Sequence, residues 1–76
     1  MIREHDRVVL MVPVPKEGLE SGDEGTVVHV YKDGKAFEVE FTALDGHTVA
    51  VATVETTHVR PVRSREITHA RELTAR

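Results

Sequence analysis

The chain has no cysteine and no tryptophan, and its only aromatic side chains are Tyr31, Phe37 and Phe41. The lack of cysteine excludes disulfides, thiolate metal ligands and thiol catalysis, and it suits a reducing compartment. No apolar run is long enough to cross a bilayer. The first seven residues mix both charge signs, unlike a signal peptide. We therefore expect a cytoplasmic protein that does not enter the membrane.

Size and charge narrow the class further. A chain of 76 residues with 39% hydrophobic residues makes one small domain, whose folding hides only about 60% of the surface of the unfolded chain. With so few aromatic residues the core must be built mainly from valine, which favours strands. A formal net charge of −3 argues against a general binder of polyanions.

The first predicted strand covers Asp6–Val12, and it is apolar on both faces, so we expect both faces to be covered. Two prolines end it. The polar segment 16–24 contains one apolar residue, Leu19, which we expect to fold back onto the core. Gly22 and Gly25 bracket the return to the next strand, where Gly25 allows a tight bend or a bulge.

An Asp-Gly pair at 33–34 predicts a hairpin with a type I′ turn, after a strand at Thr26–Tyr31. Counting outward from the turn pairs Tyr31 with Ala36 and His29 with Glu38. The alternation then divides the two strands into a core face and an outer face. The core face contains Thr26, Val28, Val30, Phe37, Val39 and Phe41, and the outer face contains Val27, His29, Tyr31, Glu38 and Glu40.

A second Asp-Gly pair, at 45–46, predicts another hairpin. The same counting places Ala50, Ala52 and Val54 beside the phenylalanines, with Val49, Val51 and Thr53 facing outward. A single bulge in segment 42–47 would exchange the alanines for Val49 and Val51. Segment 55–57 predicts a short turn, and segment 58–62 a brief last strand with Val59 inward and Pro61 at an edge.

These elements predict an all-β fold, a five-stranded SH3-like barrel in residues 1–62, because closure of a small sheet limits its exposed edges. A C-terminal tail, residues 63–76, follows. With Ser64 as a helix cap and one apolar stripe, the tail is either a docked helix or disordered. The stripe consists of Ile67, Ala70 and Leu73. The predicted core contains Val8, Leu10, Val12, Leu19, Val28, Val30, Phe37, Val39, Phe41, Ala52, Val54 and Val59.

Four motifs carry a family resemblance: Gly18-Leu19, then Gly22-Asp23-x-Gly25-Thr26-Val27-Val28, then Phe37-Glu38-Val39-Glu40-Phe41, and Asp45-Gly46. Together they resemble a small bacterial family of uncharacterised domains, over roughly residues 5–62. The resemblance implies an SH3-like barrel without catalytic residues, encoded beside small companion proteins as in toxin–antitoxin or immunity pairs. Segment 22–29 also distantly resembles the KOW motif of ribosomal and transcription-elongation proteins, although acidic residues replace the expected basic ones.

Candidate chemical groups are few. The five histidines, His5, His29, His47, His58 and His69, lack chelating spacing, so we expect no metal and no cofactor. Ser21 and Ser64 have no base nearby in the sequence, and Glu38 and Glu40 imply no pocket, so we expect no enzyme. The acidic loop 22–25 would repel phosphate.

We therefore predict a non-catalytic protein-binding module, antitoxin-like or immunity-like, that binds a basic protein and is itself a monomer or a weak homodimer. The predicted partner-binding residues are Val27, His29, Tyr31, Glu38, Glu40, Val49 and Val51. Apolar area inside a polar, acidic rim suits such a partner. The alternative is a KOW-like module that binds RNA or the ribosome through Lys32, Lys35 and the late arginines.

Overall fold

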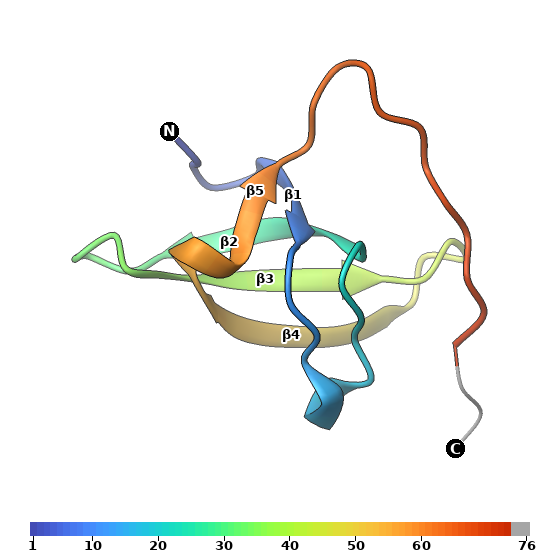
Figure 1. The fold of residues 1–76 in the computed structure, drawn as a ribbon. Helices are drawn as coiled ribbons and strands as arrows, with labels where there is room; N and C mark the ends of the chain where they lie inside the picture. The colour runs from blue at the N-terminus through green and yellow to red at the C-terminus, as the bar shows by residue number, and fades with distance from the viewer. Residues whose placement is uncertain (74–76) are drawn as a thin grey trace.

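The computed structural model describes residues 1–73, and it has one antiparallel sheet of five strands. The strands are β1 (Arg7–Leu10), β2 (Glu24–Val30), β3 (Ala36–Thr42), β4 (Thr48–Glu55) and β5 (Val59–Pro61). Two short 3₁₀ turns, η1 (Pro15–Glu17) and η2 (Thr56–His58), lie between strands. The strand order is β4-β3-β2-β1-β5, so within the described residues the sheet ends in two edges and is not closed (Figure 1).

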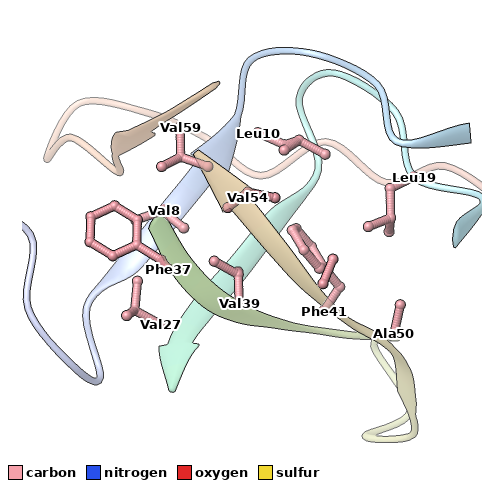
Figure 2. Close-up of a cluster of buried hydrophobic side chains, with 11 residues drawn as sticks. Val8, Leu10, Leu19, Val27, Phe37, Val39, Phe41, Ala50, Val54 and Val59 are labelled. Atoms are coloured by element: carbon pink, nitrogen blue, oxygen red, sulfur yellow. The ribbon is translucent and has the colours of Figure 1, made fainter. Parts of the chain in front are cut away.

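The core lies on one face of this sheet and contains only apolar side chains. Figure 2 shows them gathered in one cluster from all five strands and from the β1–β2 connection. Leu19 is buried, so the prediction that it folds back onto the core is confirmed. The buried residues of this cluster are Val8, Leu10, Leu19, Val27, Phe37, Val39, Phe41, Ala50, Ala52, Val54 and Val59.

A bulge in β2 overturns part of the predicted register. His29 does pair with Glu38, and Val30 with Phe37, but Val27 pairs with Val39, which leaves Val28 as the extra residue. Beyond the bulge the faces are exchanged relative to the prediction. Val27 is fully buried and Val28 is 41% exposed, so the placement of Val28 in the core, of Thr26 on the core face and of Val27 on the outer face was wrong.

Hydrogen bonds from the N-terminal segment hold the chain at this bulge. The Val27 N–H donates to the Asp6 carbonyl at 2.9 Å, and the Val27 carbonyl accepts from the His5 N–H at 2.7 Å. Both backbone groups of Val27 are thus satisfied on the β1 side of the sheet, which fixes its side chain inward. The first strand is shorter than predicted: β1 ends at Leu10, Met11 is exposed and Val12 is only half-buried.

The turns of the two hairpins differ in type from the turn that the Asp-Gly pair at 33–34 predicted. Of the two central residues of the first loop, only Gly34 has positive φ, so the predicted type I′ turn, which needs both, was wrong. Instead the Gly34 N–H donates to the Tyr31 carbonyl, and Tyr31 still pairs with Ala36. The second loop has the same arrangement, because Gly46 has positive φ and its N–H donates to the Ala43 carbonyl. In each loop an aspartate side chain accepts from the backbone N–H two residues later.

The second hairpin carries a bulge of its own. Phe41 pairs with Ala50 but Thr42 pairs with Thr48, so Val49 is the extra residue. The bulge lies before Ala50, and it therefore leaves Ala50, Ala52 and Val54 inward as predicted. Val49 itself is half-buried and packs against the core, which corrects its predicted outward position.

Gly25 is required where β2 crosses the core. A Cβ at this position would lie 2.5 Å from Cγ1 of Val39 and 2.9 Å from both the Glu40 carbonyl oxygen and Cε2 of Phe41. Only a residue without a side chain allows β2 to approach β3 and the Phe41 ring this closely. The glycine therefore permits a close approach, in addition to the bend expected from the sequence.

The end of the sheet matches its prediction. The 3₁₀ turn η2 leads into the three-residue β5, in which Val59 is buried and Pro61 stands at the edge. Val9, on the face of β1 opposite the core, is also buried, and its neighbours across the strands are Glu24 and Arg60. The second face of the first strand is thus covered, as its apolar sequence required.

Residues 63–73 form no helix: a turn at residues 64–65 is followed by irregular chain (Figure 1). The predicted apolar stripe does not dock, because its three side chains are all exposed. Ile67 is 92% exposed. The last three residues of the predicted tail lie outside the described residues. The tail forms hydrogen bonds to the domain through the charged side chains of Glu66 and Arg71.

Candidate functional site

The outer face is the side of β2, β3 and β4 opposite the core. Because side chains alternate across each strand, Glu38 and Glu40 of the central strand β3 project from it. We use the name for the side chains of Val28, His29, Tyr31, Glu38, Glu40, Thr48, Val51 and Thr53. Of the predicted partner-binding residues, the structure brings together His29, Tyr31, Glu38, Glu40 and Val51. Two predicted residues do not lie on this face: Val27 is buried in the core, and Val49 is half-buried in the β4 bulge.

Two hydroxyl groups hold the carboxylate of Glu38. The Tyr31 hydroxyl donates to Oε2 at 2.5 Å, and the Thr53 hydroxyl donates to the same oxygen at 2.8 Å. These two bonds, in this order of strength, lower the pKa of Glu38. The carboxylate is therefore ionised at neutral pH, and its hydrogen bonds stabilise one orientation of the side chain.

Glu40 is held in the same manner by β4. The Thr48 hydroxyl donates to its Oε2 at 2.6 Å. In the hydrogen bonds of the described residues, Oε1 of neither glutamate accepts. The face thus presents two oriented carboxylates, each with one oxygen left to bind another group.

Apolar surface surrounds these two carboxylates. Val51, directly opposite Glu40, is 51% exposed, and Val28 is 41% exposed at the β2 bulge. The rings of His29 and Tyr31 meet edge to face, with centroids 4.8 Å apart. His29 lies opposite Glu38 as predicted, but the nearest carboxylate to its Nδ1 is that of Glu4, at 3.9 Å.

Sequence reasoning missed the threonine hydroxyls and Val28. Thr53 is directly opposite Glu38 in the register, so its bond to the carboxylate could have been found by the same counting that placed the alanines. Val28 could not have been found in this way, because nothing in two successive valines indicates which one enters a bulge.

Two of the late arginines, a candidate set for phosphate contacts, are engaged with carboxylates. Arg71 binds Asp23 through two hydrogen bonds of 2.8 and 2.6 Å, and it also donates to the Gly18 carbonyl at 3.1 Å. Arg60 binds Glu66 through bonds of 2.9 and 2.5 Å. Outside this set, Arg7 of β1 pairs with Glu24.

These pairs change the pKa values of their acids. The Arg60 guanidinium, helped by the Arg63 N–H, lowers the pKa of Glu66 to about 2. Partial burial raises the pKa of Asp23, but hydrogen bonds from Arg71 and from the Glu20 N–H outweigh burial, and the net shift is downward. We call the contacts of Arg71 with Asp23 and Gly18 the tail clasp.

The described residues contain no group of three or more histidine, aspartate or glutamate side chains placed to hold a metal ion. The histidines lie apart, and the closest acid to His47 is Asp45 of its own loop, at 3.1 Å. A shallow hollow is lined by Asp6, Arg7 and residues 61–64, away from Glu38 and Glu40. No helix among residues 1–73 has the length and hydropathy needed to cross a membrane.

The sheet and its outer face define a small all-β domain with an acidic, partly apolar outer surface. The chain matches the family described as "Domain of unknown function (DUF4926)" over residues 4–61, and it belongs to that family. This confirms the resemblance to an uncharacterised family, and the match ends where the tail begins. No curated protein and no solved structure matches the chain.

Proposed function

We propose that this domain is a non-catalytic protein-binding module whose outer face binds a basic segment of a partner protein. The observation that carries the proposal is the pair of oriented carboxylates, Glu38 and Glu40, beside exposed Val28 and Val51. Lysine or arginine side chains of a partner can bind the free carboxylate oxygens, while its apolar groups cover the valines. Ion pairs of this kind favour a partner of opposite charge and speed its association.

The fixed orientation of the two glutamate carboxylates supports a binding role over the alternative, in which they only keep the strand solvated. A flexible surface glutamate loses side-chain entropy when it forms an ion pair, and this cost offsets much of the gain. Glu38 and Glu40 are already held by Tyr31, Thr53 and Thr48. A partner therefore meets carboxylates that have already lost part of that freedom.

The fold proposal that accompanies this function is an open form of the SH3-like barrel. The strand order, the long β1–β2 connection and the 3₁₀ turn before β5 support it. The antitoxin-like or immunity-like role and the absence of enzyme activity stay predictions, because neither the fold nor the face tests them.

RNA binding is the weaker alternative. Its candidate groups were Lys32, Lys35 and the late arginines, but Arg60 and Arg71 already bind carboxylates. The loop 22–25 offers Asp23 and Glu24 where a KOW-like site would need positive charge. No observation in the structure favours this alternative over the protein-binding face.

A pull-down from the native host tests the proposal. We expect Glu38→Gln/Glu40→Gln to lose the partner, because it removes both charges with little change in shape. A matched control, Glu17→Gln/Glu72→Gln, removes the same charge from two exposed positions elsewhere and should keep the partner. Lys32→Glu/Lys35→Glu tests the alternative, and loss of co-purifying RNA in that variant alone would overturn the protein-binding proposal.

A further inference from the structure

The outer edge of β4 is a second feature with binding potential, distinct from the outer face. β4 stands at one end of the strand order, and with eight residues it is the longest strand of the described chain. Within residues 1–73, its only ladder is with β3. The other side of β4 therefore carries backbone groups that another strand could bind.

The hydrogen-bond pattern identifies these groups. The Tyr31 N–H donates to the Ala36 carbonyl, so the backbone groups of Ala36 point toward β2. Across from it on β4, Glu55 is then a non-hydrogen-bonded partner, whose own N–H and carbonyl point away from β3. Alternation along the strand gives the same outward direction to the backbone of Thr53 and Val51.

No hydrogen bond within residues 1–73 satisfies these outward groups. The backbone bonds outside regular ladders include none to Val51, Thr53 or Glu55. The strand also lacks the features that block pairing at edges, since it has neither charge nor proline from Thr48 to Val54. Its bulge, at Val49, leaves the stretch 50–55 regular.

We propose that the occupant of this edge is a second copy of the chain, paired antiparallel through β4 about a twofold axis. An uncharged strand requires no charged partner, and a twofold arrangement makes one strand complementary to itself. With the axis at Thr53, the outward backbone groups of the two Thr53 residues pair with each other, and those of Val51 pair with those of Glu55 in the second copy, so the bulge at Val49 stays outside the contact. Each Glu55 then faces an uncharged valine, so the acidic ends do not face each other.

The net charge of −3 does not oppose this arrangement strongly. The carboxylates Glu38 and Glu40 lie on β3. In a continuous sheet, the two β3 strands would be three strand spacings apart, about 14 Å. This exceeds the screening length of about 8 Å at physiological ionic strength.

The dimer is weak, because one strand edge is a small contact. The contact buries less accessible surface than the roughly 1,200 Å² that is the lower end for stable interfaces. Its population therefore depends on protein concentration in the micromolar to millimolar range.

Sedimentation velocity of the whole protein over this concentration range tests the proposal. We expect wild type to shift from monomer to dimer as its concentration rises. Thr53→Pro should remain monomeric, because it removes an outward N–H and no bond of the β3–β4 ladder. Val28→Lys is the matched control: it changes a similarly exposed valine of the outer face that is not at the edge, and it should dimerise like wild type.

Two results would overturn the proposal. One is a wild type that is monomeric at millimolar concentration, and the other is a dimer that Val28→Lys abolishes while folded Thr53→Pro retains it. If Thr53→Pro does not fold, as judged by its amide NMR spectrum, Thr53→Lys takes its place. Two lysines that face each other at the centre of the edge should abolish the dimer, and a Thr53→Lys protein that dimerises like wild type would contradict the β4 pairing.

Discussion

The two edges of the sheet are protected in opposite ways. β5 has three residues, includes Pro61, and is followed by a turn in which Arg60 binds Glu66. β4 has eight residues, and no charge or proline interrupts its first seven. Since a long, uncharged edge strand can pair with another chain, the difference indicates that the β4 edge is the less protected of the two.

The same asymmetry extends to the faces beside the edges. Near β5 and β1, the charged residues Arg7, Glu24, Arg60 and Glu66 bind one another. Near β4, Glu38 and Glu40 are held by hydroxyl groups and keep a free oxygen each. Internal ion pairs leave little capacity for a partner, whereas oriented unpaired carboxylates retain it.

The largest expected effect is a loss of stability when the core side chain that packs under β4 is removed. Phe41 packs in the core opposite Ala50 of β4, and Phe41→Ala should lower the free energy of unfolding by about 3–5 kcal/mol. A domain of this size has about 4–11 kcal/mol in total, so the variant should be largely or wholly unfolded. Urea unfolding followed by circular dichroism measures the change.

Val28→Ala is the control for that prediction. The side chain is exposed at the bulge, so its truncation should change stability by no more than about 0.5 kcal/mol. A cooperative, stable Phe41→Ala protein, or a large loss in Val28→Ala, would mean that the assignment of the two faces is wrong.

The sequence predicted the positions that depend on alternation alone. The core residues of β3 and β4, the pairing of His29 with Glu38, and the edge position of Pro61 all follow from a period of two counted from a turn or from the chemistry of proline. Counting worked close to each turn even where the turn type was wrong, because the positions that pair across the loop did not depend on that type.

The errors arise where one residue more or less changes the face. Val27 and Val28 are identical in chemistry, and the choice between them is made by hydrogen bonds from His5 and Asp6, which local pattern does not show. The prediction of a helix in the tail failed for a related reason, because long-range contacts decide the outcome. Its narrow apolar stripe suggested a docked helix as one of two alternatives, but the described part of the tail is irregular chain, held to the domain by long-range bonds from Arg71 to Asp23.

A smaller effect is expected at the tail clasp. Arg71→Ala should lower the free energy of unfolding by about 1 kcal/mol at neutral pH, because the pair with Asp23 is only partly buried. Arg65→Ala, in the same tail but without an ion pair among the described residues, should have no measurable effect. Urea unfolding of the two variants beside wild type gives the comparison.

The pH dependence of the clasp has a definite sign. Because the pKa of Asp23 lies below its ordinary value of 3.8 in the folded protein, the folded state binds fewer protons than the unfolded state between the two values. The contribution is complete above the unfolded pKa and is lost as pH falls through the folded one. The difference between wild type and Arg71→Ala should therefore disappear in strong acid, and a difference that grew on acidification would contradict the clasp.

The openness of the β4 edge is tested most directly by amide hydrogen exchange, residue by residue, in dilute protein where only the monomer is present. The N–H groups of Ala50, Ala52 and Val54 point toward β3 and should exchange slowly, while those of Val51, Thr53 and Glu55 point outward and should exchange fast. An alternating pattern along β4 is the predicted result. Uniform slow exchange from Ala50 to Glu55 in the dilute monomer would show that another segment of the chain already covers this edge.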